Sequence, residues 1–284
     1  MVWYHTTTTP YHSTYNMLLS TSPYYSSLAF TALTPLAVVY SFAAHLWASL
    51  RCREGGPTVS PLPVGAERRQ HQVAIVTGAN TGIGYETART LAVDYGMTVV
   101  LACRSRDKGQ QAVARIQAQG GAGAVFVHPL DVSSSASIAA FGQAIRQKFD
   151  KVHILVNNAG RNSNAADPVE GNRDLLFQTN FVGHFELTAN LMDILAPKAR
   201  IVNLGSVMHH FIHGDVNTVS YWKGCITHGQ APTSTYQPSK LAAILFTMEL
   251  NRRYGDRLES VAVNPGGVYV KILVCLSCSD PRQA

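Results

Sequence analysis

The chain has 284 residues, of which 46% are hydrophobic and 14% are charged, and its formal net charge at pH 7 is +6. This length and hydrophobic content suffice for one globular domain with a sizeable core. The positive charges are scattered and form no basic run interleaved with aromatic residues, which argues against a nucleic acid partner. The five cysteines lack a disulfide-framework spacing, so they favour a reducing compartment over a secreted scaffold.

The N-terminal region is uncharged: the first fifty residues contain no Lys, Arg, Asp or Glu. Residues 1–27 are rich in Thr, Ser and Tyr and are predicted to be a disordered leader. Residues 28–50 are mostly apolar and long enough to span a bilayer, although Pro35 and His45 count against a regular helix. Basic residues follow at 51–53, so the positive-inside rule predicts a membrane anchor with the rest of the chain in the cytosol.

A folded domain is predicted over residues 71–284, after a linker rich in Pro and Gly at 51–70. Runs of Val, Ile, Leu and Ala alternate in it with segments of helical periodicity, as in a doubly wound α/β (Rossmann) fold with a parallel sheet. Strands are expected at 73–77, 98–103, 124–128, 153–157, 200–204 and 260–264. Helices are expected at 84–95, 105–119, 135–149, 174–195 and 235–254. Ligand sites should lie at the carboxyl ends of the strands.

The first strand is followed by the glycine-rich sequence Thr77-Gly78-Ala79-Asn80-Thr81-Gly82-Ile83-Gly84. Glycines are needed where the backbone adopts a positive φ or approaches a phosphate closely, and a helix N-terminus offers free N–H groups to an anion. A strand, glycine turn and helix in this order predict a dinucleotide pyrophosphate site. The alternative is a strand-to-helix connection with flexible glycines and no ligand.

Tyr236 and Lys240 are four residues apart, a spacing that puts both on one face of a helix. A nearby cation favours the phenolate form of a tyrosine, which suits proton transfer. Alone, this spacing also occurs by chance on surface helices. Together with the glycine turn, it points to hydride-transfer chemistry.

The chain resembles the short-chain dehydrogenase/reductase family from about Gln72 to Val268. Within that family it is similar to the retinol dehydrogenase-like branch, through Leu101-Ala102-Cys103-Arg104, Ser206-Val207-Met208-His209-His210 and Ser239-Lys240-Leu241-Ala242. The motifs that carry the family resemblance are the glycine turn, Asp131-Val132, Asn157-Asn158-Ala159-Gly160, Asn180 within Gln178–His184, Gly205-Ser206-Val207, Tyr236 with Lys240, and Asn264-Pro265-Gly266.

The resemblance implies four catalytic residues. Tyr236 would be the general acid/base, and Lys240 would support it and hold the nicotinamide ribose hydroxyls. Ser206 would hydrogen-bond the substrate oxygen, with a role as a strand-end cap as the alternative. Asn180 would position a water in a proton relay to Lys240, or else bond its own backbone.

The cofactor-binding residues implied by the resemblance follow the strand ends. Asp131 would accept a hydrogen bond from the adenine amino group, and Asn157 with Gly160 would border the cofactor, although Asp131 or Asn157 could equally form a turn. The predicted set is Thr77, Gly78, Asn80, Thr81, Gly82, Ile83, Gly84, Arg104, Asp131, Val132, Asn157, Ala159, Gly160, Tyr236, Lys240, Pro265, Gly266 and Val268.

The end of the second strand indicates which dinucleotide is preferred. An acidic residue there would bond the ribose 2′-hydroxyl of NAD, whereas this chain has Cys103-Arg104-Ser105. The planar guanidinium of Arg104 can pair with a 2′-phosphate, so NADP(H) is favoured over NAD(H). A solvated arginine at a strand end is the alternative.

The expected substrate is a small lipophilic alcohol or carbonyl compound, such as a retinoid or steroid. Met208, Phe211, Tyr221 and Trp222 lie between Ser206 and Tyr236 and could line its site or belong to the ordinary core. The histidines at 209, 210, 213 and 228 lack neighbouring ligands at metal-site spacing, so no metal is predicted. The resemblance places the anchored protein in the endoplasmic reticulum, with a homo-oligomer possible.

The C-terminal end departs from the family pattern. Eighteen residues follow Gly266, where the family continues with a substrate-covering helix, a further helix and a last strand. The threonine that the pattern expects at position 270 is a valine. The chain is therefore expected to be truncated, and the alternative to an active enzyme is an inactive dinucleotide-binding or interaction module. A sugar-nucleotide epimerase fits poorly, because the glycines fall as Gly-x-x-x-Gly-x-Gly.

Overall fold

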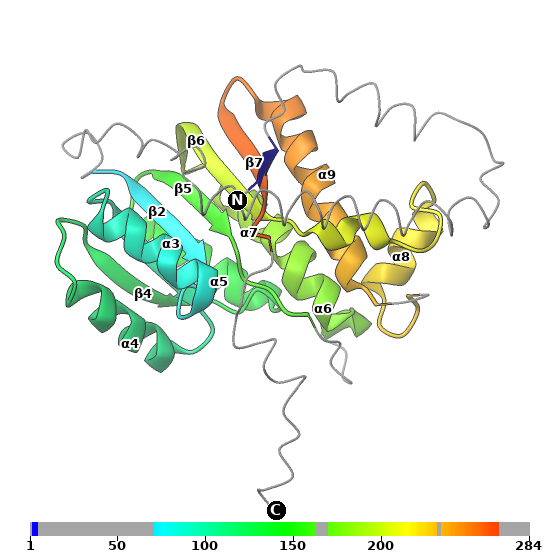
Figure 1. Ribbon diagram of the computed structural model, residues 1–284, viewed down its shortest axis with the longest axis horizontal. Coiled ribbons are helices and arrows are strands. Elements are labelled where there is room, and N and C mark those ends of the chain that lie inside the picture. Colours follow the sequence, from blue (N-terminus) through cyan, green and yellow to red (C-terminus); the bar gives the residue numbers. More distant parts are fainter. Residues whose placement is uncertain (1, 5–70, 163–169, 232–233, 267–284) are drawn as a thin grey trace, which may run out of the picture. The chain divides into compact units, whose positions relative to one another are not determined.

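The computed structural model of this protein describes residues 2–4, 71–162, 170–231 and 234–266, and Figure 1 shows its ribbon. Residues 65–284, with the first three, form one compact unit, and Tyr4–Val64 form a second. The predicted leader (apart from residues 2–4), anchor and linker lie outside the described residues. Among the described residues, no helix is long and apolar enough to cross a membrane.

The centre of the fold is a parallel sheet of six strands, β2 to β7. Their bounds are β2 (Val73–Thr77), β3 (Thr98–Cys103), β4 (Val125–Pro129), β5 (Val152–Asn157), β6 (Leu195–Leu204) and β7 (Leu258–Asn264). Among the described residues, the strand order is β1-β7-β6-β5-β2-β3-β4, in which β1 (Val2–Tyr4) is a short strand next to β7. From β2 the chain adds β3 and β4 on one side of the sheet. It then crosses to the other side of β2, where β5, β6 and β7 follow in order. Ligands of doubly wound sheets bind at this switch point, at the carboxyl ends of β2 and β5.

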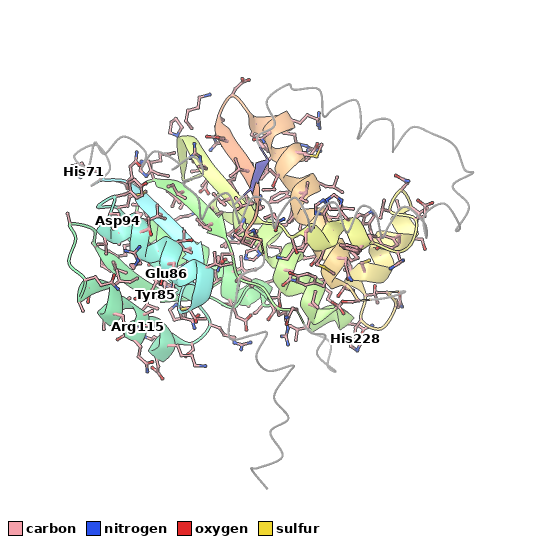
Figure 2. The ribbon with its side chains drawn as sticks, in the orientation of Figure 1. His71, Tyr85, Glu86, Asp94, Arg115 and His228 are labelled. Carbon is pink, nitrogen blue, oxygen red and sulfur yellow. The ribbon has the colours of Figure 1, made fainter. Side chains whose placement is uncertain are left out.

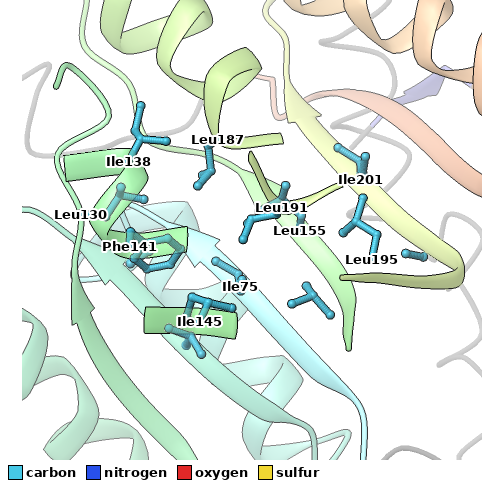
Figure 3. Close-up of a cluster of buried hydrophobic side chains, with 14 of the residues drawn as sticks. Ile75, Leu130, Ile138, Phe141, Ile145, Leu155, Leu187, Leu191, Leu195 and Ile201 are labelled. Carbon is cyan, nitrogen blue, oxygen red and sulfur yellow. The ribbon is translucent and has the colours of Figure 1, made fainter. Parts of the chain in front are cut away.

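Both faces of the sheet are buried, as the apolar strand sequences predict. Successive residues of β2 point to opposite faces, so Ile75 joins one core cluster while Ala74 and Val76 join the other. The Ile75 cluster, part of which Figure 3 shows, includes side chains from α5 (Ser135–Lys148), α7 (Gly183–Leu191) and α9 (Tyr236–Tyr254). The other cluster includes side chains from α3 (Gly82–Val93) and α4 (Arg106–Gln117).

The segment 174–195, expected to be one helix, is divided in the structure. It consists of α6 (Leu175–Phe177), the π-helix η3 (Gln178–Val182) and α7, and Leu195 already belongs to β6, where it pairs with Val152. A close approach accompanies the irregularity, because a Cβ at Gly183 would lie 1.8 Å from the carbonyl oxygen of Val132. Single-turn π-helices of this kind often mark functional sites.

Three short helices between residues 170 and 226 were not expected. They are η2 (Glu170–Asn172), η4 (Val207–Phe211) and α8 (Val219–Ile226), and Thr218 caps the last by accepting a hydrogen bond from Tyr221 N at 3.2 Å. Tyr221 is 8% exposed and belongs to a small core cluster with Phe177 and Cys225. The aromatic stretch thus contributes in part to ordinary core, one of the two interpretations that the sequence allowed.

Candidate active site

The glycine turn connects β2 to α3 and has the backbone that its glycines predict. Gly78 and Gly82 have positive φ angles of 64° and 59°. A Cβ at Gly84 would lie 2.4 Å from Asn158 Nδ2 and 2.6 Å from Gly78 O, so only glycine allows this approach of helix and turn. The turn therefore needs glycine at positions 78 and 82 for the positive φ, and at position 84 for the close approach of helix and turn.

The N-terminus of α3 is open. Its N-cap residue, Thr81, makes no side-chain capping hydrogen bond, and no acidic residue lies in the first turn. The turn is supported from α4, where Arg115 donates to the carbonyl oxygen of Asn80 at 3.0 Å and lies 4.3 Å from the centroid of the Tyr85 ring (Figure 2). A helix N-terminus without a capping side chain can offer its backbone N–H groups to an anion, which fits the pyrophosphate of a dinucleotide.

Thr77, at the end of β2, joins the glycine turn to the loop after β5. Its fully buried hydroxyl oxygen lies 2.8 Å from the backbone nitrogens of both Asn158 and Ala159. The Asn158 side chain returns a hydrogen bond to Thr77 O at 2.7 Å. These hydrogen bonds therefore hold the carboxyl ends of β2 and β5 together at the switch point.

The predicted catalytic residues Tyr236 and Lys240 lie in the first turns of α9. Tyr236 begins the helix, and Lys240 Nζ lies 5.6 Å from the centroid of its ring. Lys240 is 7% exposed and donates to Leu204 O, at the end of β6, at 2.9 Å. Burial lowers the pKa of Lys240 to about 8, because the interior disfavours the charged ammonium. The ammonium of Lys240 therefore lies near the ring of Tyr236, as their spacing on one helix predicts.

Ser206 follows the end of β6 and is brought close to α9 by the packing of η4 against that helix. Its hydroxyl caps η4 by accepting from Met208 N at 3.2 Å, as the alternative interpretation expected. Accepting this bond leaves the hydroxyl proton available for donation. The capping role and the predicted role towards a substrate oxygen are thus compatible.

Asn180 lies in the π-helix and is 4% exposed. Its side chain accepts from Arg161 N at 2.8 Å and donates to Arg161 O at 2.9 Å and to Ser239 Oγ at 3.2 Å. Ser239 Oγ in turn donates to Tyr236 O at 2.6 Å. Asn180 therefore connects the loop after β5 with the helix that carries Tyr236, and its side chain bonds the backbone of another segment instead of its own.

A small cavity lies between this π-helix and the sheet. The volume open to the centre of a water molecule is about 10 Å³, on the order needed for one water. Asn157 Oδ1, which belongs to a lining residue, is buried without a hydrogen-bond partner among the residues that the structure describes. The lining residues are Asn157, Asn180, Phe181, His184, Asn203, Leu204, Ala243 and Phe246.

Asn157 and Asp131 form internal contacts. The Asn157 amide donates to Asn203 Oδ1 at 2.8 Å and to Thr188 Oγ1 at 3.1 Å, in a buried polar network. Asp131 Oδ1 accepts from the backbone nitrogen of Ser133 at 2.9 Å, which makes it the turn former that the sequence allowed. Val132 is buried beside it.

The other predicted cofactor residues lie at the carboxyl ends of the strands. Arg104 is exposed directly after β3, and a Cβ at Gly160 would lie 3.2 Å from Asn180 Oδ1. Gly266, after Pro265, donates its backbone N–H to Asn264 Oδ1 at 3.1 Å. Val268 and the valine at position 270 lie outside the described residues. Within the described ranges, no group of three or more His, Cys, Asp or Glu residues is placed to hold a metal ion.

Four positioning residues were not predicted: Asn158, Asp174, His184 and Ser239. Asp174 Oδ1 accepts from Phe177 N at 2.8 Å and from Thr235 Oγ1 at 2.7 Å, which fixes the start of α9. The other three lie inside the motifs quoted from the sequence, but the partners of Asn158 and His184 at Thr77 are 81 and 107 residues distant. Only the i+4 spacing of His184 from Asn180 was visible in the sequence.

Comparison with known proteins supplies the family. The family model described as short chain dehydrogenase matches residues 72–276. The chain belongs to the short-chain dehydrogenase family. Retinol dehydrogenase 11 of Mus musculus is 40% identical over 208 residues, which are 71% of this chain and 63% of the relative. This similarity places the chain in the retinol dehydrogenase-like branch.

Two further proteins are similar to the chain. Polyprenol dehydrogenase of Mus musculus is 36% identical over 206 residues, 69% of this chain and 60% of the relative. The NADP active-site complex of Pseudomonas aeruginosa RhlG has a TM-score of 0.57 at 26% identity and covers 72% of this chain and 75% of that one. The chain spans somewhat less than two thirds of the length of the two curated relatives.

Proposed function

We propose that this protein is an NADP(H)-dependent oxidoreductase that interconverts an alcohol and a carbonyl group on a lipophilic substrate. The observation that carries this proposal is the buried ammonium of Lys240 beside the ring of Tyr236, at the end of the strand that Ser206 follows. The names of the similar retinol and polyprenol dehydrogenases support a lipophilic alcohol as the substrate class. The open glycine turn supports a dinucleotide.

Different residues of the chain would bind the cofactor and transfer the proton. The glycine turn and the N-terminus of α3 would hold the pyrophosphate, Arg104 a 2′-phosphate, and Lys240 the ribose hydroxyls. When bound, the nicotinamide supplies or accepts the hydride. Tyr236 would give its phenolic proton to a carbonyl oxygen during reduction, or take one from an alcohol during oxidation. Lys240 would stabilise the phenolate, and Ser206 would donate to the substrate oxygen as its charge develops.

The proposal is tested by the turnover of NADPH. Purified full-length protein is expected to oxidise NADPH when an apolar aldehyde or ketone is added, with the matching alcohol as product. Binding of NADPH, seen as quenching of protein fluorescence, without turnover on a panel of carbonyl compounds would instead show an inactive dinucleotide-binding module.

The preference for NADP(H) predicts a charge-reversal result. Arg104→Asp is expected to weaken NADPH binding by about 10- to 100-fold, because it removes a charge-assisted pair and places a carboxylate near the phosphate. NADH binding should be unchanged or tighter. Lys151→Asp is the control, since Lys151 is exposed just before the amino end of β5, opposite the expected cofactor edge. Equal effects of the two variants on NADPH affinity would contradict the role of Arg104.

We also propose that residues 28–50 anchor the protein to the endoplasmic reticulum, with residues 71–284 facing the cytosol. The support is the uncharged apolar stretch followed by Arg51 and Arg53. The protein is expected to pellet with membranes and to resist extraction by high-pH carbonate, whereas a variant that lacks residues 28–50 should be released. Release of the full chain by carbonate would contradict the anchor.

A further inference from the structure

His184 is a buried histidine that the proposed mechanism does not use. It lies in the first turn of α7, is 4% exposed, and lines the small cavity beside Asn180. Its Nε2 atom lies 3.0 Å from Thr77 Oγ1, and its Nδ1 atom lies 3.4 Å from the carbonyl oxygen of Asn180. The ring of His184 therefore contacts both Thr77, where the glycine turn begins, and the π-helix that contains Asn180.

The hydrogen bonds of Thr77 determine what its hydroxyl can offer to His184. A hydroxyl has two acceptor lone pairs and one proton. The backbone N–H groups of Asn158 and Ala159, both at 2.8 Å, occupy the two lone pairs. Thr77 can therefore only donate, either to Val156 O at 3.2 Å or to His184 Nε2 at 3.0 Å. For the shorter contact, with His184, to be a hydrogen bond, Nε2 must present a lone pair.

The other side of the ring leads independently to the same tautomer. The Asn180 carbonyl oxygen can only accept, so His184 Nδ1 must carry the proton to make this contact. A neutral imidazole with its proton on Nδ1 satisfies both neighbours at once. The opposite tautomer satisfies neither.

We infer that His184, as the neutral Nδ1–H tautomer, is a positioning residue that couples the glycine turn at Thr77 to the π-helix that carries Asn180. A proton on Nε2 would face a hydroxyl whose lone pairs are full, so Thr77 would have to release a backbone N–H of residues 158–159. That loop borders the cofactor only if the proposed function is right. The tautomer and the coupling of the two segments do not depend on it.

The electrostatics of the site keep the ring neutral. The pKa of His184 is lowered to about 4, mainly by burial; the hydrogen bond to the Asn180 backbone raises it in part, and the charge of Lys240 adds a smaller lowering effect. The imidazole should therefore remain uncharged throughout the physiological range.

The first test is the protonation state of His184 in the full-length protein. Long-range ¹H–¹⁵N correlation spectra of detergent-solubilised, histidine-labelled protein at pH 7 should show Nε2 of His184 without a proton and Nδ1 with one, and the signals should be assigned by their loss in His184→Asn. They should stay unshifted from pH 7 to about pH 6. The Nε2–H tautomer, or an imidazolium at pH 7, would overturn the inference.

The second test uses two variants with NADPH affinity and turnover as readouts. His184→Phe fills the space without polar atoms and should weaken NADPH binding and lower kcat, each by about tenfold, the usual effect of one lost buried hydrogen bond. His184→Asn retains an amide N–H that can reach the backbone carbonyl of Asn180 but loses the acceptor for Thr77, so it should recover part of kcat and leave NADPH binding weakened. If both variants matched the wild type, His184 would be mere filler and the inference would fail.

Controls keep failure of the inference separate from failure of the proposed function. Circular dichroism and thermal unfolding show whether each variant is folded. If His184→Phe does not fold, the tautomer seen in the spectra of the wild type decides the inference. A wild type without turnover would remove the proposed enzyme, yet NADPH affinity and the tautomer would still test the role of His184.

Discussion

Tyr236→Phe is expected to lower turnover of NADPH with an apolar carbonyl substrate by about 10³-fold or more, the range that general acid/base catalysis contributes. The phenylalanine keeps the ring that lies beside Lys240 and removes only the hydroxyl proposed to exchange a proton with the substrate oxygen. NADPH binding should remain nearly unchanged, because the glycine turn, Arg104 and Lys240 are intact. Steady-state kinetics and fluorescence quenching on the same preparations separate the two effects.

Tyr254→Phe is the matched control, because Tyr254 is the last residue of the same helix and is 37% exposed. This variant should turn over NADPH at the wild-type rate, since its hydroxyl lies at the other end of α9 from the active site. Wild-type turnover in Tyr236→Phe would remove Tyr236 from its role. A parallel loss of NADPH binding would show that the substitution had disturbed the site as a whole.

The sequence predicted the order of the fold because its strands are buried on both faces. β2 and β3 have the expected bounds, since their apolar runs end at Thr77 and at Cys103, where the turns begin. β6 begins earlier than expected, because Pro197 and Lys198, the latter with a φ of 60°, interrupt the apolar sequence after its first two residues. The π-helix around Asn180 was missed because an i→i+5 turn has no periodic signature in the sequence.

The sequence predicts which candidate site residues lie near one another where they are local, and it does not where they meet across the fold. Tyr236 and Lys240 are joined by one helix, so their spacing alone predicts their proximity. The contacts of Thr77 with Asn158 and His184 form only because β2, β5 and α7 converge at the switch point. No local sequence pattern predicts them. Asn157 lies in a conspicuous motif, yet its amide serves a buried network with Asn203.

The burial of Lys240 also has a stability cost, whose size follows from its pKa. The folded pKa of about 8 lies below the ordinary value of 10.5, so between these pH values the unfolded chain holds a proton that the folded protein has released. Stability due to this group therefore rises with pH across that window. Below pH 8 both states are protonated, and the full cost, about 3 kcal/mol, is present.

Lys240→Met should therefore separate function from stability. At pH 7 it is expected to abolish turnover and to raise the free energy of unfolding by about 2 kcal/mol, because it removes the buried charge and loses the bond to Leu204 O, worth about 1 kcal/mol. Near pH 10.5 the wild-type lysine is neutral in the folded state without cost, so this advantage should disappear. Denaturant unfolding of both proteins at pH 7 and pH 10.5, with exposed Lys151→Met as the control, measures the change. An identical difference at the two pH values would mean that Lys240 is not buried as a costly cation.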